Sequence, residues 1–361
     1  MLQVFSLGFD LRRVLLMSVA GSWTVAVVGL YLALISWRVA GYPLDAALAP
    51  KHLEHSWRLL VSPDVTFDRA LLWIGVAGLW WLGFARIITP VFRSLALEVS
   101  RDERPDQKAM VVASHRLSGL VTGSPLSALL VAALFFGCVL LCAVLAKLPA
   151  PVGTGLAALI LPLALIAALI AAAVLIVTVV SLPMMTPAAV IECRDLMDVV
   201  SRAAAYVLQR PFRYLAGLCA KLGVTLVAAV VGGAVFLLAW ALIYLALVMV
   251  GEGDLALSSY RLVRRSGEVR ADLVTGAAFF AAAFYGSAMI WLGWFLTVGA
   301  ASDVILYMVM RYEVDGVTFD EIMIPQEHIE KHGLTALDTQ KQQQAAQAAS
   351  NADPEPAKAS N

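Results

Sequence analysis

Six long apolar segments divide the chain, and charged or polar stretches separate them. The apolar segments are residues 14–37, 70–89, 125–146, 152–182, 215–250 and 273–310. Each has the roughly 20 residues that a helix needs to cross a bilayer, and a helix satisfies its own backbone hydrogen bonds in lipid. The pattern therefore predicts an all-α fold: a polytopic membrane helical bundle with about six transmembrane helices, formed by residues 1–325.

The fourth, fifth and sixth apolar segments are longer than a bilayer requires, so these helices must tilt, break or extend into water. Pro162 and the pair Gly232 and Gly233 are the predicted places for kinks or close helix contact. An extra helix hidden in the fifth or sixth segment is the open alternative. It would move the C-terminus to the other side of the membrane.

The two connectors at residues 105–121 and 188–210 have the period of amphipathic helices. In the second connector the apolar arc consists of Leu196, Met197, Val200, Ala203, Ala204, Val207 and Leu208. The opposite arc carries Glu192, Asp195, Asp198, Arg202 and Gln209. We expect both connectors to be interfacial helices that lie in the membrane surface.

The two connectors also resemble each other, which raises the possibility of an internal repeat. Ser114 and His115 precede Pro125 by about the same distance as Ser201 and Arg202 precede Pro211. Each proline begins a long apolar segment, so the unit would be an interfacial helix followed by a helical hairpin. Many transport folds are built from such repeats, although chance recurrence of Ser and Pro near helix ends is an equal alternative.

Composition and charge support the membrane interpretation. Hydrophobic residues make up 61% of the 361 residues and charged residues 14%, against about 25% charged in soluble chains. The formal net charge is zero, so nucleic acid is not an expected partner.

Basic residues are enriched in the connectors after the second and fourth segments, which predicts that both connectors and both termini are cytoplasmic in a cell inner membrane. Residues 326–361 hold too little apolar surface to fold and predict a disordered cytoplasmic tail.

Motifs of known catalytic chemistry are absent from the sequence, including HExxH, GxSxG, GxGxxG and a phosphate-binding loop. The four cysteines lie in or beside apolar segments without a CxxC pair, which favours packing over a disulfide or zinc site. We therefore predict no catalytic residues, no metal and no cofactor.

Two charged residues lie inside apolar segments. Lys221 follows Arg213 by eight residues and Asp303 precedes Arg311 by eight residues, so both lie about 12 Å inside a flanking arginine. Charged residues at membrane depth are candidates for function, and one hypothesis pairs Lys221 with Asp303. The slightly favoured alternative is that Lys221 snorkels to the interface and Asp303 caps a helix.

The densest polar cluster lies in the second connector and comprises Glu192, Arg194, Asp195, Asp198, Arg202 and Arg210. It is a candidate docking surface for a cytoplasmic partner or for lipid headgroups. The favoured interpretation is structural, with these residues forming the solvated side of an interfacial helix.

The same region resembles uncharacterised bacterial multi-pass membrane proteins of planctomycete type. The shared positions are Asp198, Ser201, Arg202, Tyr206, Arg210, Pro211, Phe212 and Tyr214, followed after the last helix by Asp315, Gly316, Asp320 and Glu321. Ala204 and Ala205 depart from the more polar or aromatic residues expected between Arg202 and Tyr206. The resemblance implies the membrane topology and no catalytic activity.

These observations favour a non-enzymatic scaffold or accessory subunit that contacts the lipid bilayer and a membrane or cytoplasmic protein. A transporter or permease subunit with Lys221 and Asp303 at its site is the main alternative, and an intramembrane enzyme acting on lipid is a weaker one. The oligomeric state does not follow from the sequence.

Overall fold

The computed structural model describes residues 4, 7–40, 67–102, 107–149, 152–192, 195–251, 253–264 and 273–319. The described residues are 94% helical and contain no strand. The predicted all-α fold is therefore confirmed. The predicted disordered tail at 326–361 lies outside the described residues.

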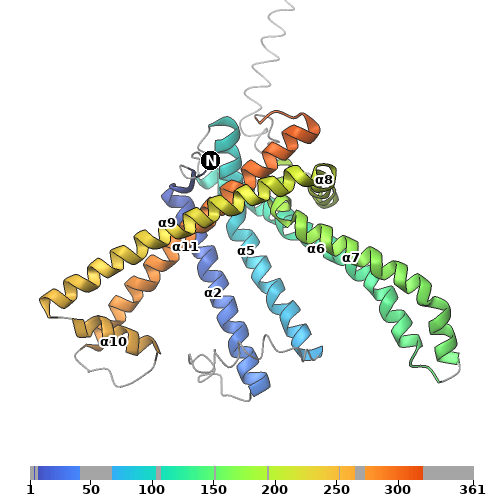
Figure 1. Ribbon diagram of the computed structural model, residues 1–361, viewed down its shortest axis with the longest axis horizontal. Helices are drawn as coiled ribbons and strands as arrows, with labels where there is room; N and C mark the ends of the chain where they lie inside the picture. The colour runs from blue at the N-terminus through green and yellow to red at the C-terminus, as the bar shows by residue number, and fades with distance from the viewer. Residues whose placement is uncertain are drawn as a thin grey trace, which may run out of the picture. The chain divides into compact units, whose positions relative to one another are not determined.

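Figure 1 shows the helices in chain order. They are α2 (Leu11–Ala40), α5 (Phe67–Arg101), α6 (Gln107–Leu145), α7 (Val152–Glu192), α8 (Leu196–Gln209), α9 (Pro211–Val250), α10 (Gly253–Arg264) and α11 (Val274–Asp315). Six of them, all except α8 and α10, are long and apolar enough to cross a membrane. The chain is thus a multi-pass membrane protein, as its apolar segments predict.

The first connector differs from the prediction. Within the predicted connector at 105–121, residues 107–121 do not form a separate interfacial helix, because α6 runs without a break from Gln107 through Pro125 to Leu145. In the same way α5 continues past Pro90 to Arg101, and α7 continues through three prolines to Glu192. Prolines are tolerated inside membrane helices where neighbouring groups satisfy the freed backbone. Proline was therefore a poor guide to helix ends here.

The second connector is divided between two helices. Its first residues complete α7, and α8 begins only at Leu196. A break at Arg210, with φ −133° and ψ 59°, separates α8 from α9, which has Pro211 at its first turn. Proline suits that position because its missing N–H would have no helical acceptor. The two predicted repeat units therefore differ, since only the second has a separate short helix.

Helix α10 was not predicted. Its 12 residues are too few to span a bilayer, and Gly251 ends α9 before it in the left-handed conformation. Helices α9 and α11 each remain one continuous helix. Within the described residues, neither long apolar segment hides an additional span.

Glycine permits close approach between the spans. A Cβ atom at Gly232 of α9 would collide with the ring of Trp294 on α11, and one at Gly293 of α11 would collide with the Val14 carbonyl of α2. Small residues at such crossings allow helix backbones to pack closely in membranes. The predicted close contact at Gly232 is confirmed.

Burial is concentrated at one end of α7. Every residue from Met184 to Glu192 is buried, whereas Leu159, Leu163 and Leu169 nearer the start of the same helix are mostly exposed. Helices α5, α8 and α11 all contact α7. The best-packed part of the described structure is therefore where these four helices meet, and the exposed apolar surface elsewhere suits lipid.

Candidate functional site: a buried charge network and an intramembrane ion pair

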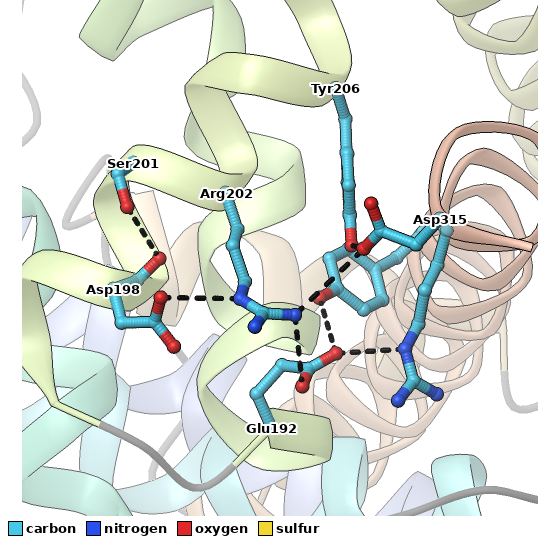
Figure 2. A network of polar contacts seen from close by, with 8 residues as sticks. Glu192, Asp198, Ser201, Arg202, Tyr206 and Asp315 are labelled. Atoms are coloured by element: carbon cyan, nitrogen blue, oxygen red, sulfur yellow. Dashed lines mark hydrogen bonds and ion pairs between the residues drawn. The ribbon is translucent and has the colours of Figure 1, made fainter. Parts of the chain in front are cut away.

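Glu192, the last residue of α7, is the centre of a network of charged side chains (Figure 2). Its side chain is only 4% exposed. Oε1 accepts a hydrogen bond from the Tyr307 hydroxyl at 3.1 Å and lies 2.8 Å from Arg311 Nε, both on α11. Oε2 accepts a bond from Arg202 Nη1 of α8 at 3.5 Å. A buried carboxylate is tolerated only when it is paired in this way.

Arg202 and Tyr206 extend the network along α8. Arg202 Nε donates to Asp198 Oδ1 at 3.2 Å, and its Nη1 lies 3.8 Å from Asp315 Oδ2 at the end of α11. The Tyr206 hydroxyl donates to the same Asp315 carboxylate, and its ring lies 5.6 Å from that of Tyr307. The network therefore joins three helices, as Figure 2 shows.

The electrostatics of α8 follow from these contacts. Burial, together with the hydrogen bond to Asp315, raises the pKa of the Tyr206 phenol well above its ordinary value. Burial alone would lower the pKa of Arg202, but the hydrogen bond to Asp198 and the charge of Glu192 outweigh it and raise that pKa. Tyr206 therefore stays a neutral donor and Arg202 a cation across the physiological range.

A further arginine, on α5, binds the end of α7. Arg93 of α5 is buried and donates from Nη1 to the Val190 carbonyl at 2.5 Å. The Tyr214 hydroxyl at the start of α9 donates to the Val180 carbonyl at 2.6 Å. Val190 is among the last four residues of α7, whose carbonyls have no N–H donor within the helix, and the Arg93 side chain supplies a donor there.

The structure brings together only part of the predicted cluster. Glu192, Asp198 and Arg202 belong to the network, whereas Asp195 is exposed at the start of α8 and its side chain makes no capping bond. Arg210 is exposed at the junction of α8 and α9. Arg194 lies outside the described residues.

The predicted position of Glu192 on the solvated face of an interfacial helix is wrong. Glu192 belongs to α7 and is buried against α11, because α7 continues past the expected end of the fourth span. Tyr307 and Arg311 were not predicted as site residues, although their spacing of four residues places them on one face of the last helix. Tyr206 and Asp315 were named only as positions shared with the family that the chain resembles, and not as site residues.

The second charged site consists of Lys221 on α9 and Asp303 on α11, whose pairing was the less favoured of two hypotheses. Lys221 Nζ donates to Asp303 Oδ1 at 2.5 Å, and the two side chains are 18% and 14% exposed. Their contact is confirmed. The alternative with a snorkelling lysine and a capping aspartate is wrong, since Asp303 lies within α11, which continues to Asp315.

The two sites are suited to different tasks. In the network the carboxylates are engaged by side chains from neighbouring helices, so the arrangement holds helices together rather than presenting a free nucleophile or base. Among the described residues, no group of three or more His, Cys, Asp or Glu side chains could hold a metal ion. The Lys221–Asp303 pair is simpler, because one acid and one base within the spans exchange a single hydrogen bond.

Fold and site together define an all-α, multi-pass membrane protein with a charged network where α7, α8 and α11 meet. No protein-family model, curated protein or solved structure matches this chain. The resemblance to planctomycete-type membrane proteins therefore stays a prediction.

Proposed function

We propose that this chain is a non-enzymatic scaffold or accessory subunit of the cell inner membrane, with its N- and C-termini in the cytoplasm. The supporting observation is that the buried Glu192 carboxylate ties the end of α7 to both α8 and α11. Breaking a buried pair by removing one partner costs about 3–5 kcal/mol, so the network resists separation of these helices.

The network gives α8 two distinct faces. Val199, Ala203 and Tyr206 are buried on its inner face, whereas Ser201 and Leu208 are exposed on its outer face. A short helix held rigidly, with a mixed polar and apolar outer face, suits contact with a membrane or cytoplasmic protein at low entropic cost. The arginines of the α7–α9 connector favour the cytoplasmic side for this face.

A photo-crosslinking amino acid at Leu208 tests the scaffold proposal in native membranes. The same amino acid at Leu237, an exposed apolar position on α9, is the matched control. We expect a discrete protein adduct at position 208, absent at 237, whose yield falls when Glu192→Leu releases α8. Equal adducts at both positions, or none at 208 alongside solute uptake by reconstituted vesicles, would contradict the proposal.

A transporter or permease subunit is the second candidate, and the Lys221–Asp303 contact favours it. An acid–base pair between two spans, partly buried as this one is, is a recognised element of ion and proton pathways. In this case Asp303→Asn would abolish solute-driven proton flux into vesicles, while Asp254→Asn on the short helix α10 would leave the flux unchanged. Equal proton flux in the two variants would exclude the transporter function.

A further inference from the structure

A groove of about 290 Å³ lies between the α6–α7 pair and α8. Its lining includes Ala128 and Val131 of α6, Ala173 and Val177 of α7, and Val200 and Ala204 of α8. Small and branched apolar residues thus contribute from all three helices. The groove is separate from the charged network, since none of the network side chains lines it.

The two hydroxyl groups in the lining are already used. Thr178 donates to the Val174 carbonyl at 2.7 Å, and Ser181 donates to the Val177 carbonyl at 2.7 Å. Both bonds run within α7 itself. Because no lining hydroxyl proton is left for a ligand, the groove side chains donate no hydrogen bond and offer chiefly van der Waals contact, which suits hydrocarbon.

The dimensions of the groove fit one narrow chain. Along α7 it extends from Ala173 to Met185, which corresponds to about 18 Å at the rise of an α-helix. A helix of that length, about 10 Å wide, occupies roughly 1,400 Å³, which is about twice the roughly 680 Å³ of empty space in the groove. The volume of about 290 Å³ is at the low end of the roughly 300–1,000 Å³ of small-ligand sites.

The groove is continuous with surface that suits lipid. The same turns of α7 expose Leu175, Ile176 and Val179, and they belong to a helix that is apolar enough to span the membrane. An apolar groove beside bilayer hydrocarbon fills with it, because an unfilled groove loses dispersion contacts on its open side.

We propose that this groove binds one acyl chain of a bilayer phospholipid, which packs against α8 from the membrane side. Lipid tails are about as apolar as leucine, so retention depends on shape and close contact rather than on transfer out of water. Met185 and Met197, which also line the groove, can adapt to the chain because their side chains are unbranched and flexible. The proposal is independent of the scaffold function.

The test uses phosphatidylcholine with a photoactivatable diazirine in the middle of one acyl chain, reconstituted with the full-length protein in phosphatidylcholine vesicles. Labelled positions on α7 and α8 are then mapped by mass spectrometry. Ala173→Phe fills the groove, and Ala172→Phe places the same ring on the same turn outside it. We expect labelling of Val177 and Val200 to fall about tenfold in the first variant and to stay unchanged in the second.

A second groove variant distinguishes loss of lipid binding from misfolding. Ala204→Leu enters the groove from α8, and a monodisperse elution profile on size exclusion shows that a variant is folded. Reduced labelling in both groove variants, with the Ala172→Phe control at the wild-type level, supports the proposal. Equal labelling in all variants would show an ordinary annular lipid and overturn it, as would cross-links from Val200 to a second copy of the chain.

Discussion

The network around Glu192 and the Lys221–Asp303 pair both join helices through acid–base contacts, but they differ in redundancy. Glu192 is bound by side chains from two other helices and is almost fully buried. Asp303 is hydrogen-bonded to Lys221, and both side chains keep some exposure. The network therefore holds its helices after the loss of a single bond. The pair can separate by the movement of one lysine side chain, which makes it the better candidate for a changing contact.

Removing the centre of the network has the largest expected effect. Glu192→Leu leaves Arg311 and Arg202 buried or half-buried without their shared carboxylate, so we expect a loss of about 3–5 kcal/mol in the free energy of unfolding. Denaturant titration of the purified protein in detergent measures it. The control Asp195→Asn changes an exposed carboxylate three residues away and should stay within about 0.5 kcal/mol. A loss of similar size in both variants would refute the central role of Glu192.

The contact between α9 and α11 has a packing component that does not involve the pair. Gly232→Ala forces a methyl group against the Trp294 ring, so we expect a loss of about 1–3 kcal/mol. Gly223→Ala on the same helix meets no atom within 4 Å and serves as the control. If Gly232→Ala were as stable as Gly223→Ala, the close approach at Gly232 would contribute nothing to the stability of the contact between α9 and α11.

A double-mutant cycle with Lys221→Met and Asp303→Asn measures the pair itself. Each single change strands the partner charge, so the double variant should be more stable than the sum of the singles predicts, by about 1 kcal/mol. Urea or detergent unfolding of the four proteins provides the four free energies. Additive losses would mean that the contact contributes nothing to stability.

The contribution of Tyr206 to stability has a defined pH dependence. Tyr206→Phe removes the hydrogen bond to Asp315 and should cost about 1.5 kcal/mol near pH 7. Because the folded-state pKa of Tyr206 is raised, the phenol stays protonated in the folded protein at a pH where it ionises in the unfolded chain. Its stabilisation is complete below the unfolded pKa of about 10 and is lost as the pH rises above it.

Unfolding free energies at a series of pH values from 8 upward, for wild type and Tyr206→Phe, isolate this contribution from those of other tyrosines. The wild type should lose stability more steeply than the variant above about pH 10. Parallel curves would mean that Tyr206 is not held as a neutral donor.

The apolar pattern predicted the spans well because membrane helices need long apolar segments regardless of their neighbours. The apolar pattern did not predict where the membrane helices end. Prolines 90, 125, 183 and 187 all lie inside helices, because long apolar helices in a membrane tolerate proline. Helix ends depended on contacts between segments far apart in the chain.

The two charged sites were predictable to different degrees, because one is visible in the local sequence and the other depends on contacts between distant segments. Lys221 and Asp303 are conspicuous as charges in apolar segments of equal depth, so their pairing could be proposed from spacing alone. Glu192 was placed on the wrong face, because its burial depends on Tyr307 and Arg311 more than a hundred residues later. No local pattern reveals such a partner.

The distance between α8 and α11 tests most directly whether the network fixes α8. Spin labels at exposed Leu208 and Tyr312, in a background with Cys138, Cys142, Cys193 and Cys219 replaced by alanine, report it by double electron–electron resonance. We predict a narrow distance distribution in this background and with Lys221→Met, and a broad one with Glu192→Leu. A distribution that stays narrow with Glu192→Leu, or broadens equally with Lys221→Met, would contradict the account.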